Sequence, residues 1–362
     1  MPARSRKAGG TIGSALSREG AMSDIQAVAD LAGVSTATVS RALSGKGNVS
    51  EKTRASVVAA AKQLGYVVSS NASSLATGRT RNIGVVIPFL TKWFYSSVLE
   101  GAESALLSHG YDLTLYNLGG GGDERRSVFE HFLLRKRVDA VIAISLELTP
   151  RELTGLLGMG KPVVGVGGPL PGVRTLSIDD VEVAQLATEH LLSLGHRSIA
   201  HIGGTKDYER DFHLPTNRRI GYEGALEAVG ISVNPGLFQA ADFTIEGGYG
   251  AAKQLLGNPR ERPTAIFAAS DEMAIGAILA ARDMGLDVPG DVSIIGIDDH
   301  ELSDFFGLST VAQFPELQGR LAAEILMEQL HPDKRTRGSL NTALPYELIV
   351  RSSTARPKSA RQ

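Results

Sequence analysis

The chain has 362 residues, of which 43% are hydrophobic and 21% are charged, a composition typical of a globular protein with room for more than one domain. No apolar run approaches the roughly 20 residues that span a bilayer, and the basic stretch MPARSRKAGG lacks the apolar segment of a secretory signal. The sequence contains no cysteine, which excludes disulfides and thiolate zinc sites. We therefore expect a cytoplasmic protein without a membrane partner.

The net charge of −2 conceals an uneven distribution. Residues 1–80 contain 10 Lys and Arg but 4 Asp and Glu, whereas the remainder contains 27 and 35. A basic N-terminal part favours a module that binds a polyanion. A basic disordered tail is the alternative, because four of those cations lie in residues 1–22, which lack periodicity. Met22 precedes the first predicted helix and is an alternative start codon.

Residues 24–43, DIQAVADLAGVSTATVSRAL, predict two short helices separated by a tight turn. Gly33 ends the first helix, because glycine tolerates the left-handed conformation of a sharp stop. Ser35 is a good N-cap for the second, with Val39 and Leu43 on its buried face. The outward face carries Thr36, Ala37, Thr38, Ser40 and Arg41. Such a face suits the major groove of DNA, although any small helical hairpin with a glycine turn has the same pattern.

Ser50 begins a third predicted helix over residues 51–66, which completes a helix-turn-helix domain over residues 23–66. Residues 67–80, VVSSNASSLATGRT, are small and polar and are expected to form a hinge. Leu75 is the large apolar side chain in its middle, and an apolar wedge in the minor groove kinks the duplex. The alternative is a flexible linker.

From residue 82 onward, predicted strands and helices alternate in two series. The first series has strands at 82–89, 112–118, 139–145 and 161–168, with helices at 95–110, 124–138 and 149–160. The second has helices at 179–196, 217–230, 245–257 and 271–285, with strands at 198–204, 237–243, 264–270 and 291–298. Repeated β-α units predict doubly wound parallel sheets, and two series predict a two-lobed α/β body with a cleft.

Polar side chains follow several predicted strands, where open parallel sheets bind ligands. The acidic candidates are Asp179, Asp180, Asp271, Asp298 and Asp299, and the basic ones are Arg218 and Arg219. Carboxylates beside arginine suit sugar hydroxyls or other polar small molecules, but an Asp after a strand equally fits a helix N-cap. The aromatic cluster Trp93, Phe94 and Tyr95 stacks on a sugar ring or belongs to the core.

Motifs that would indicate catalysis are missing. The sequence has no GxSxG elbow and no GxxxxGK[ST] loop, and residues 119–123, GGGGD, do not satisfy GxGxxG. The eight histidines lack HExxH spacing, and His190 and His196 are expected in a helix and its terminating turn. We therefore expect no enzyme, no metal and no cofactor.

Several stretches together resemble the lactose-repressor (LacI/GalR) family of bacterial transcription regulators. They are VADLAGVSTATVSRALSG, VSEKTRASVVAAAKQLGY, SLATGRTRNIGVVIP, HLLSLGHRSIAHIGG, PTAIFAASDEMAIGAILAARDMGL and VPGDVSIIGIDD. The resemblance runs from about Asp24 to Arg351. It implies a helix-turn-helix, a hinge and a two-lobed, periplasmic-binding-protein-like body, in that order.

The resemblance also implies functional roles. Thr36, Ala37 and Arg41 would read bases, with Ser35, Thr38 and Ser40 near phosphates. Leu75 would be the wedge at the centre of a palindromic operator bound by a homodimer. The effector pocket would comprise Trp93, Phe94, Tyr95, Ile178, Asp179, Arg218, Ser270, Asp298 and Gln313. The N-terminal lobe would span 81–178 and about 314–340, the C-terminal lobe 179–313 and about 341–351, and a tail 352–362.

Departures from the family pattern bear on the hinge and the pocket. Val68 and Ser69 replace a proline and an asparagine, and Ser73 replaces an arginine, which favours a hinge that binds DNA less tightly or orders less readily. Ser270 replaces an asparagine and shortens one pocket contact. The C-terminal RSSTARPKSARQ is too short and polar for a tetramer-forming leucine-heptad helix.

The expected function is a repressor of sugar or carbohydrate metabolism genes that responds to a sugar or a sugar derivative. Two rival classes share part of this pattern. A periplasmic-type solute receptor would have a signal peptide and no helix-turn-helix. A sugar-modifying enzyme would need a catalytic acid and base in the cleft, which the carboxylates permit.

Overall fold

The computed structural model describes residues 24–44, 48–66, 78–119, 122–135, 137–205, 212–331 and 339–358. The chain divides into two compact units, Met1–Thr80 and Arg81–Gln362, and the boundary coincides with the end of the expected hinge. Leu75, the expected hinge wedge, lies outside the described residues.

The N-terminal unit contains the three expected helices, α1 (Ile25–Ala32), α2 (Thr36–Ser44) and α3 (Glu51–Leu64). Gly33 ends α1 in the left-handed conformation, with φ 66°. The Oγ atoms of Ser35 and Ser50 each accept a backbone N–H three residues later at 3.2 Å, which caps α2 and α3. One fully buried valine from each helix, Val28, Val39 and Val57, forms the centre of a small core.

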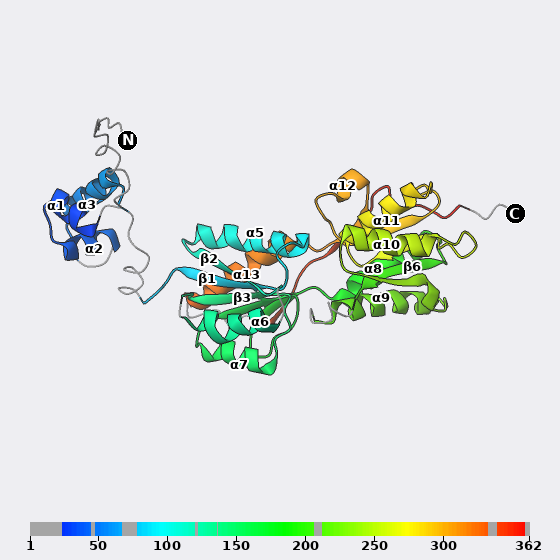
Figure 1. The fold of residues 1–362 in the computed structure, drawn as a ribbon, viewed down its shortest axis with the longest axis horizontal. Helices are drawn as coiled ribbons and strands as arrows, with labels where there is room; N and C mark the ends of the chain where they lie inside the picture. The colour runs from blue at the N-terminus through cyan, green and yellow to red at the C-terminus, as the bar shows by residue number, and fades with distance from the viewer. Residues whose placement is uncertain are drawn as a thin grey trace, which may run out of the picture. The chain divides into compact units, whose positions relative to one another are not determined.

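The N-terminal lobe of the body is built on a parallel sheet with the order β11-β5-β4-β3-β1-β2. Its strands are β1 (Asn82–Ile87), β2 (Asp112–Asn117), β3 (Ala140–Ile144), β4 (Val163–Val166), β5 (Arg174–Ser177) and β11 (Asn341–Ala343). Helices α5 (Trp93–Ser108) and α13 (Pro315–Leu330) cover one face, and α6 (Gly122–Ser127) and α7 (Pro150–Gly158) cover the other (Figure 1).

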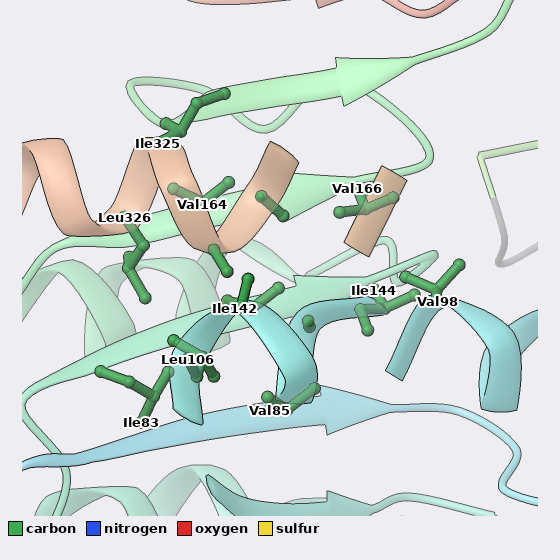
Figure 2. Packing of buried hydrophobic residues seen from close by; sticks show 14 of the residues in the cluster. Ile83, Val85, Val98, Leu106, Ile142, Ile144, Val164, Val166, Ile325 and Leu326 are labelled. Carbon is green, nitrogen blue, oxygen red and sulfur yellow. The ribbon is translucent and has the colours of Figure 1, made fainter. Parts of the chain in front are cut away.

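Figure 2 shows the packing of α5 and α13 on this sheet. Alternate side chains of the strands face the helices, as the period of two requires. The labelled strand residues are Ile83, Val85, Ile142, Ile144, Val164 and Val166, and the helix residues are Val98, Leu106, Ile325 and Leu326. Burial of an aliphatic side chain of this size stabilises a fold by about 1.5–3 kcal/mol, so this layer contributes much of the stability of the N-terminal lobe.

One predicted helix of the N-terminal lobe differs from expectation. In place of a single helix over 124–138, α6 is followed by a π-helical turn at Val128–Phe132 and a 3-10 turn at Leu133–Arg135. Val128 and Leu133 are both buried in the same cluster although they lie five residues apart. A π-helical turn bonds residues at this spacing and brings both onto one face.

The C-terminal lobe has a second sheet with the order β12-β10-β9-β8-β6-β7, in which β12 alone is antiparallel to its neighbour. Its strands are β6 (Ile199–Gly204), β7 (Phe238–Ala241), β8 (Ala265–Ala268), β9 (Ser293–Asp298), β10 (Ser309–Ala312) and β12 (Glu347–Ile349). Its helices are α8 (Asp180–Ser193), α9 (Leu214–Ala228), α10 (Ile245–Leu256), α11 (Asp271–Asp283) and α12 (Ser303–Phe306). Helices α10 and α11 cover one face, and α8 and α9 the other (Figure 1).

The C-terminal segment contributes a strand to each sheet. Strand β11 pairs with β5 of the first sheet, so the chain passes to the second lobe after Ala343, close to the expected boundary at about residue 341. Residues 352–358 are not a free tail, since Ser353 is 2% exposed and its hydroxyl donates to the carbonyl of Ile294 at 2.6 Å. Across the described ranges, no helix is long and apolar enough to cross a membrane.

Candidate functional site

Helix α2 presents the side chains that the sequence assigns to DNA. Ser35, Ala37, Ser40 and Arg41 are exposed, and Thr36 and Thr38 are half-buried. The opposite side of the helix is held by buried Val39 and Ala42, so the polar side is oriented outward by the core. The Arg41 Nε donates to the carbonyl of Ala37 at 3.1 Å, a bond that uses one of the five N–H donors of the guanidinium.

A pocket of about 690 Å³, including its opening to solvent, lies between the two lobes. Its walls come from the carboxyl ends of strands in both sheets and from α5, α8, α9, α11 and α13. The lining residues are Lys92, Phe94, Tyr95, Ser145, Gly167, Ile178, Asp180, Leu214, Arg218, Phe243, Ser270, Glu272, Asp298, Gln313 and Gln318. Seven of the nine expected effector residues are among them, and Trp93 and Asp179 are not.

Arg218 is fixed on one wall of the pocket. Its side chain is 3% exposed, its Nε donates to Asp180 Oδ1 at 2.8 Å, and a second N–H donates to the carbonyl of Ala269. Asp179 is exposed and caps α8, with Oδ1 accepting the N–H groups of Val181 and Glu182 at 3.0 and 3.1 Å. Of these two neighbouring acidic candidates, Asp180 lines the pocket and Asp179, which the family resemblance implies, does not.

Asp298 ends β9 with φ 131° and is 6% exposed. Its Oδ1 accepts the amide of Gln313, and the amide of Gln318 donates in turn to the carbonyl of Gln313 at 2.7 Å. Burial raises the pKa of Asp298 to about 8, which Asp271 also favours and which Arg218 and the Gln313 hydrogen bond oppose. Near neutral pH its carboxyl group therefore carries a proton that it can donate to a ligand.

The raised pKa of Asp298 predicts a dependence of stability on pH. The folded chain holds the proton of Asp298 more tightly than the unfolded chain does. The resulting contribution to the free energy of unfolding is complete below the unfolded pKa near 3.8 and is lost as the pH rises to the folded pKa of about 8. Between pH 6.5 and 8.5 the free energy of unfolding should fall by up to about 1.4 kcal/mol per pH unit. Asp298→Asn should lack this slope, which denaturant titration of both proteins at several pH values would measure.

Two other predicted carboxylates have structural roles. Asp271 is fully buried and accepts the backbone N–H of His300 at 2.9 Å and the hydroxyls of Ser303 and Thr310 at 2.7 Å, so it joins α11 to the ends of β9 and β10. Burial raises the pKa of Asp271 to about 6. Asp299 is paired with Arg351 at 2.8 Å. Both lie outside the pocket lining.

The aromatic cluster occupies two different settings. Phe94 and Tyr95 line the pocket, and Tyr95 also packs edge-on against Phe94 with ring centroids 5.5 Å apart. Trp93 lies instead against the ring of His300, with centroids 4.6 Å apart, and borders a neighbouring hollow. Arg219 is also outside the pocket lining, and it pairs with Glu223 at 2.6 Å. Both interpretations therefore apply to Phe94 and Tyr95, because Tyr95 also belongs to the buried core and Phe94 packs against it, whereas Trp93 belongs to neither the pocket lining nor this core.

Contacts between the lobes involve residues that sequence reasoning missed. The Lys92 Nζ, from the N-terminal lobe, donates to the carbonyls of Asp242 and Phe243 at 2.8 and 3.0 Å. Phe212 packs against the N-terminal lobe at Gly168, where a Cβ would lie 2.2 Å from the phenyl ring. These contacts join the two lobes, and Lys92 and Phe243 also line the pocket.

The remaining missed lining residues are Ser145, Gly167, Leu214, Phe243, Glu272 and Gln318. The signal that local patterns carry is weak: Ser145, Gly167 and Phe243 lie at the ends of predicted strands, where open parallel sheets bind ligands. Among the residues that the structure describes, no three His, Asp or Glu side chains come together as a metal site requires.

Comparisons with known proteins agree with both units. Residues 24–69 match the family model of bacterial regulatory proteins of the lacI family, and residues 188–354 match a periplasmic binding protein-like domain. The chain is 34% identical to the HTH-type transcriptional repressor PurR of Haemophilus influenzae, over 92% of this chain and 98% of that protein. It is 35% identical to the ribose operon repressor of Escherichia coli, over 85% and 93%.

Solved structures show the same architecture. A lac repressor dimer bound to operator and the anti-inducer ONPF has a TM-score of 0.78 and 28% identity, covering 91% of this chain and 98% of that one. A complex of the transcriptional regulator CelR with cellobiose has a TM-score of 0.66 and 32% identity, covering 91% and 99%.

Proposed function

Because the chain belongs to the LacI family of bacterial regulatory proteins, we propose that it represses genes of sugar or carbohydrate metabolism under the control of a small molecule. One observation carries the proposal: a pocket with walls from both lobes occurs in the same chain as a helix-turn-helix with an outward polar face. A ligand in such a pocket favours one arrangement of the lobes and so can change the state of the whole repressor.

The proposed effector is a sugar or a sugar derivative. Carboxyl, amide and hydroxyl groups in the pocket suit hydroxyl groups of a ligand, and Phe94 and Phe243 suit its apolar faces. The similar proteins include a ribose operon repressor and a regulator bound to cellobiose. We assign effector contacts to the seven expected residues that line the pocket and place Asp180, rather than Asp179, beside Arg218.

On DNA, we propose a homodimer whose two-fold symmetry matches a palindromic operator. Thr36, Ala37 and Arg41 would contact bases, and the hydroxyls of Ser35, Thr38 and Ser40 would contact phosphates. Residues 67–80 would act as the hinge, with Leu75 as a minor-groove wedge. The effector would change the angle between the lobes and thereby the fit of the two hinge segments to DNA.

A screen of the purified full chain tests this proposal. A sugar that binds the folded protein raises its melting temperature, and at a concentration 100 times its Kd it adds about 2.7 kcal/mol to the free energy of unfolding. The same sugar should shift the affinity for an operator fragment selected from random duplexes. Chemical conversion of a sugar that stabilises the protein would instead support the rival function of a sugar-modifying enzyme. Stabilisation without any specific DNA binding would favour a solute receptor.

A further inference from the structure

The pocket carries two cationic side chains, and both are already engaged by the protein. Arg218 is held by Asp180 and by the carbonyl of Ala269, so its charge is balanced inside the wall. The Lys92 Nζ is held by two backbone carbonyls of the opposite lobe. An anionic group of a ligand would therefore meet cations that already interact with Asp180 and with backbone carbonyls, and it would share their remaining N–H donors with these partners.

Glu272, in contrast to these two cations, is an acidic side chain of the pocket. It lies in the first turn of α11, is half-buried and faces the pocket. Within the described part of the chain, no hydrogen bond holds its carboxylate, whose electrostatic neighbours are Lys92, Asp242 and Glu246. Burial raises the pKa of Glu272, as do the carboxylates of Asp242 and Glu246, while Lys92 lowers it. The pocket therefore offers an uncommitted acceptor to a ligand that brings hydroxyl donors.

We propose that the effector is an uncharged polyhydroxyl compound, a free sugar rather than a sugar phosphate or sugar acid, and that Glu272 enforces this selection. The proposal rests on the proposed function, because it specifies the chemistry of the same pocket. The carboxylate of Glu272 accepts hydroxyl donors of a neutral sugar. It repels a phosphate or carboxylate group placed in the same enclosed space, where charges are poorly screened.

The test measures affinity by titration calorimetry and thermal shift on the full chain. The probes are D-ribose with ribose 5-phosphate, and D-glucose with glucose 6-phosphate, glucuronate and 6-O-methylglucose. Glucuronate adds charge with little bulk, and 6-O-methylglucose adds bulk without charge. In the wild type, the best neutral sugar should bind at least tenfold more tightly than its charged derivatives.

Glu272→Gln removes the charge and keeps the shape, and it should reduce this preference at least fivefold. The matched control is Glu103→Gln, because Glu103 is an exposed carboxylate on α5 outside the pocket lining, and this variant should keep the wild-type preference. Melting of each variant without sugar confirms that it folds.

The possible failures are distinguishable. If the sugar phosphate or glucuronate binds the wild type as tightly as the neutral sugar, this inference is wrong while the proposed function stands. If the neutral sugar is preferred but Glu272→Gln leaves the preference unchanged, Glu272 does not enforce the selection. If 6-O-methylglucose is rejected as strongly as glucose 6-phosphate, bulk rather than charge decides. If no sugar in either form binds, the proposed effector class fails as well.

Discussion

Replacing Arg41 by alanine is expected to weaken binding to the specific operator by about 1–3 kcal/mol and to relax the preference at the base pair it contacts. Arg41 is exposed on the outward side of α2, and its guanidinium has N–H donors that suit the two acceptors on a guanine edge. Alanine is a better helix former than arginine, so α2 should persist. Fluorescence anisotropy with operator and scrambled duplexes measures the effect.

The control for this variant is Lys62→Ala, which removes a positive charge from an exposed position in the last turn of α3. Loss of a charge alone lowers affinity for every duplex by a similar factor and reduces the dependence on salt. Arg41→Ala should instead lower the ratio of specific to non-specific affinity. An unchanged ratio would remove Arg41 from the set of base contacts.

Replacing Asp298 by alanine is expected to abolish the effector response, with sugar affinity at least about 100-fold lower, or about 2.7 kcal/mol. The change removes a ligand contact and leaves the Gln313 amide, deep in the pocket, without its acceptor. The operator affinity without effector should remain near that of the wild type, because the helix-turn-helix belongs to a separate compact unit. Operator titrations with and without sugar measure both quantities.

Asp298→Asn provides the comparison for this prediction. Asparagine keeps the size of the side chain and an oxygen for Gln313, and like aspartate it tolerates positive φ better than alanine does. It also resembles the protonated carboxyl group that a pKa of about 8 implies near neutral pH. This variant should therefore keep part of the response. A parallel loss of operator binding, effector response and melting temperature in Asp298→Ala would indicate a folding role instead.

Much of the local structure could be predicted from the sequence because its causes lie within a few residues. Gly33 and Ser50 determine where α1 ends and α3 begins through backbone conformation and capping alone. Alternating apolar strands and amphipathic helices likewise predicted the two parallel sheets. The same reasoning missed the π-helical turn at Val128–Phe132, since hydrophobic periodicity does not distinguish a local change of pitch.

The pocket could be predicted only in part. Resemblance to the family placed Arg218, Ser270, Asp298 and Gln313 correctly in its lining. It also suggested Asp179, whereas Asp180 faces the pocket. The difference is one residue at the start of α8: the side chain of Asp179 turns back to cap the helix, and Asp180 is its first helical residue. The pairing of Asp180 with Arg218 of α9 then holds that carboxylate at the pocket wall.

The sequence by itself determined the outward polar face of residues 35–41, the two-lobed α/β body and the family to which the chain belongs. These features follow from capping, periodicity and motif order, which are local. The tertiary structure alone decided that Lys92 reaches across to the opposite lobe, that Glu272 enters the pocket and that β11 returns to the first sheet. Such contacts join segments far apart along the chain, and their geometry depends on how whole elements pack.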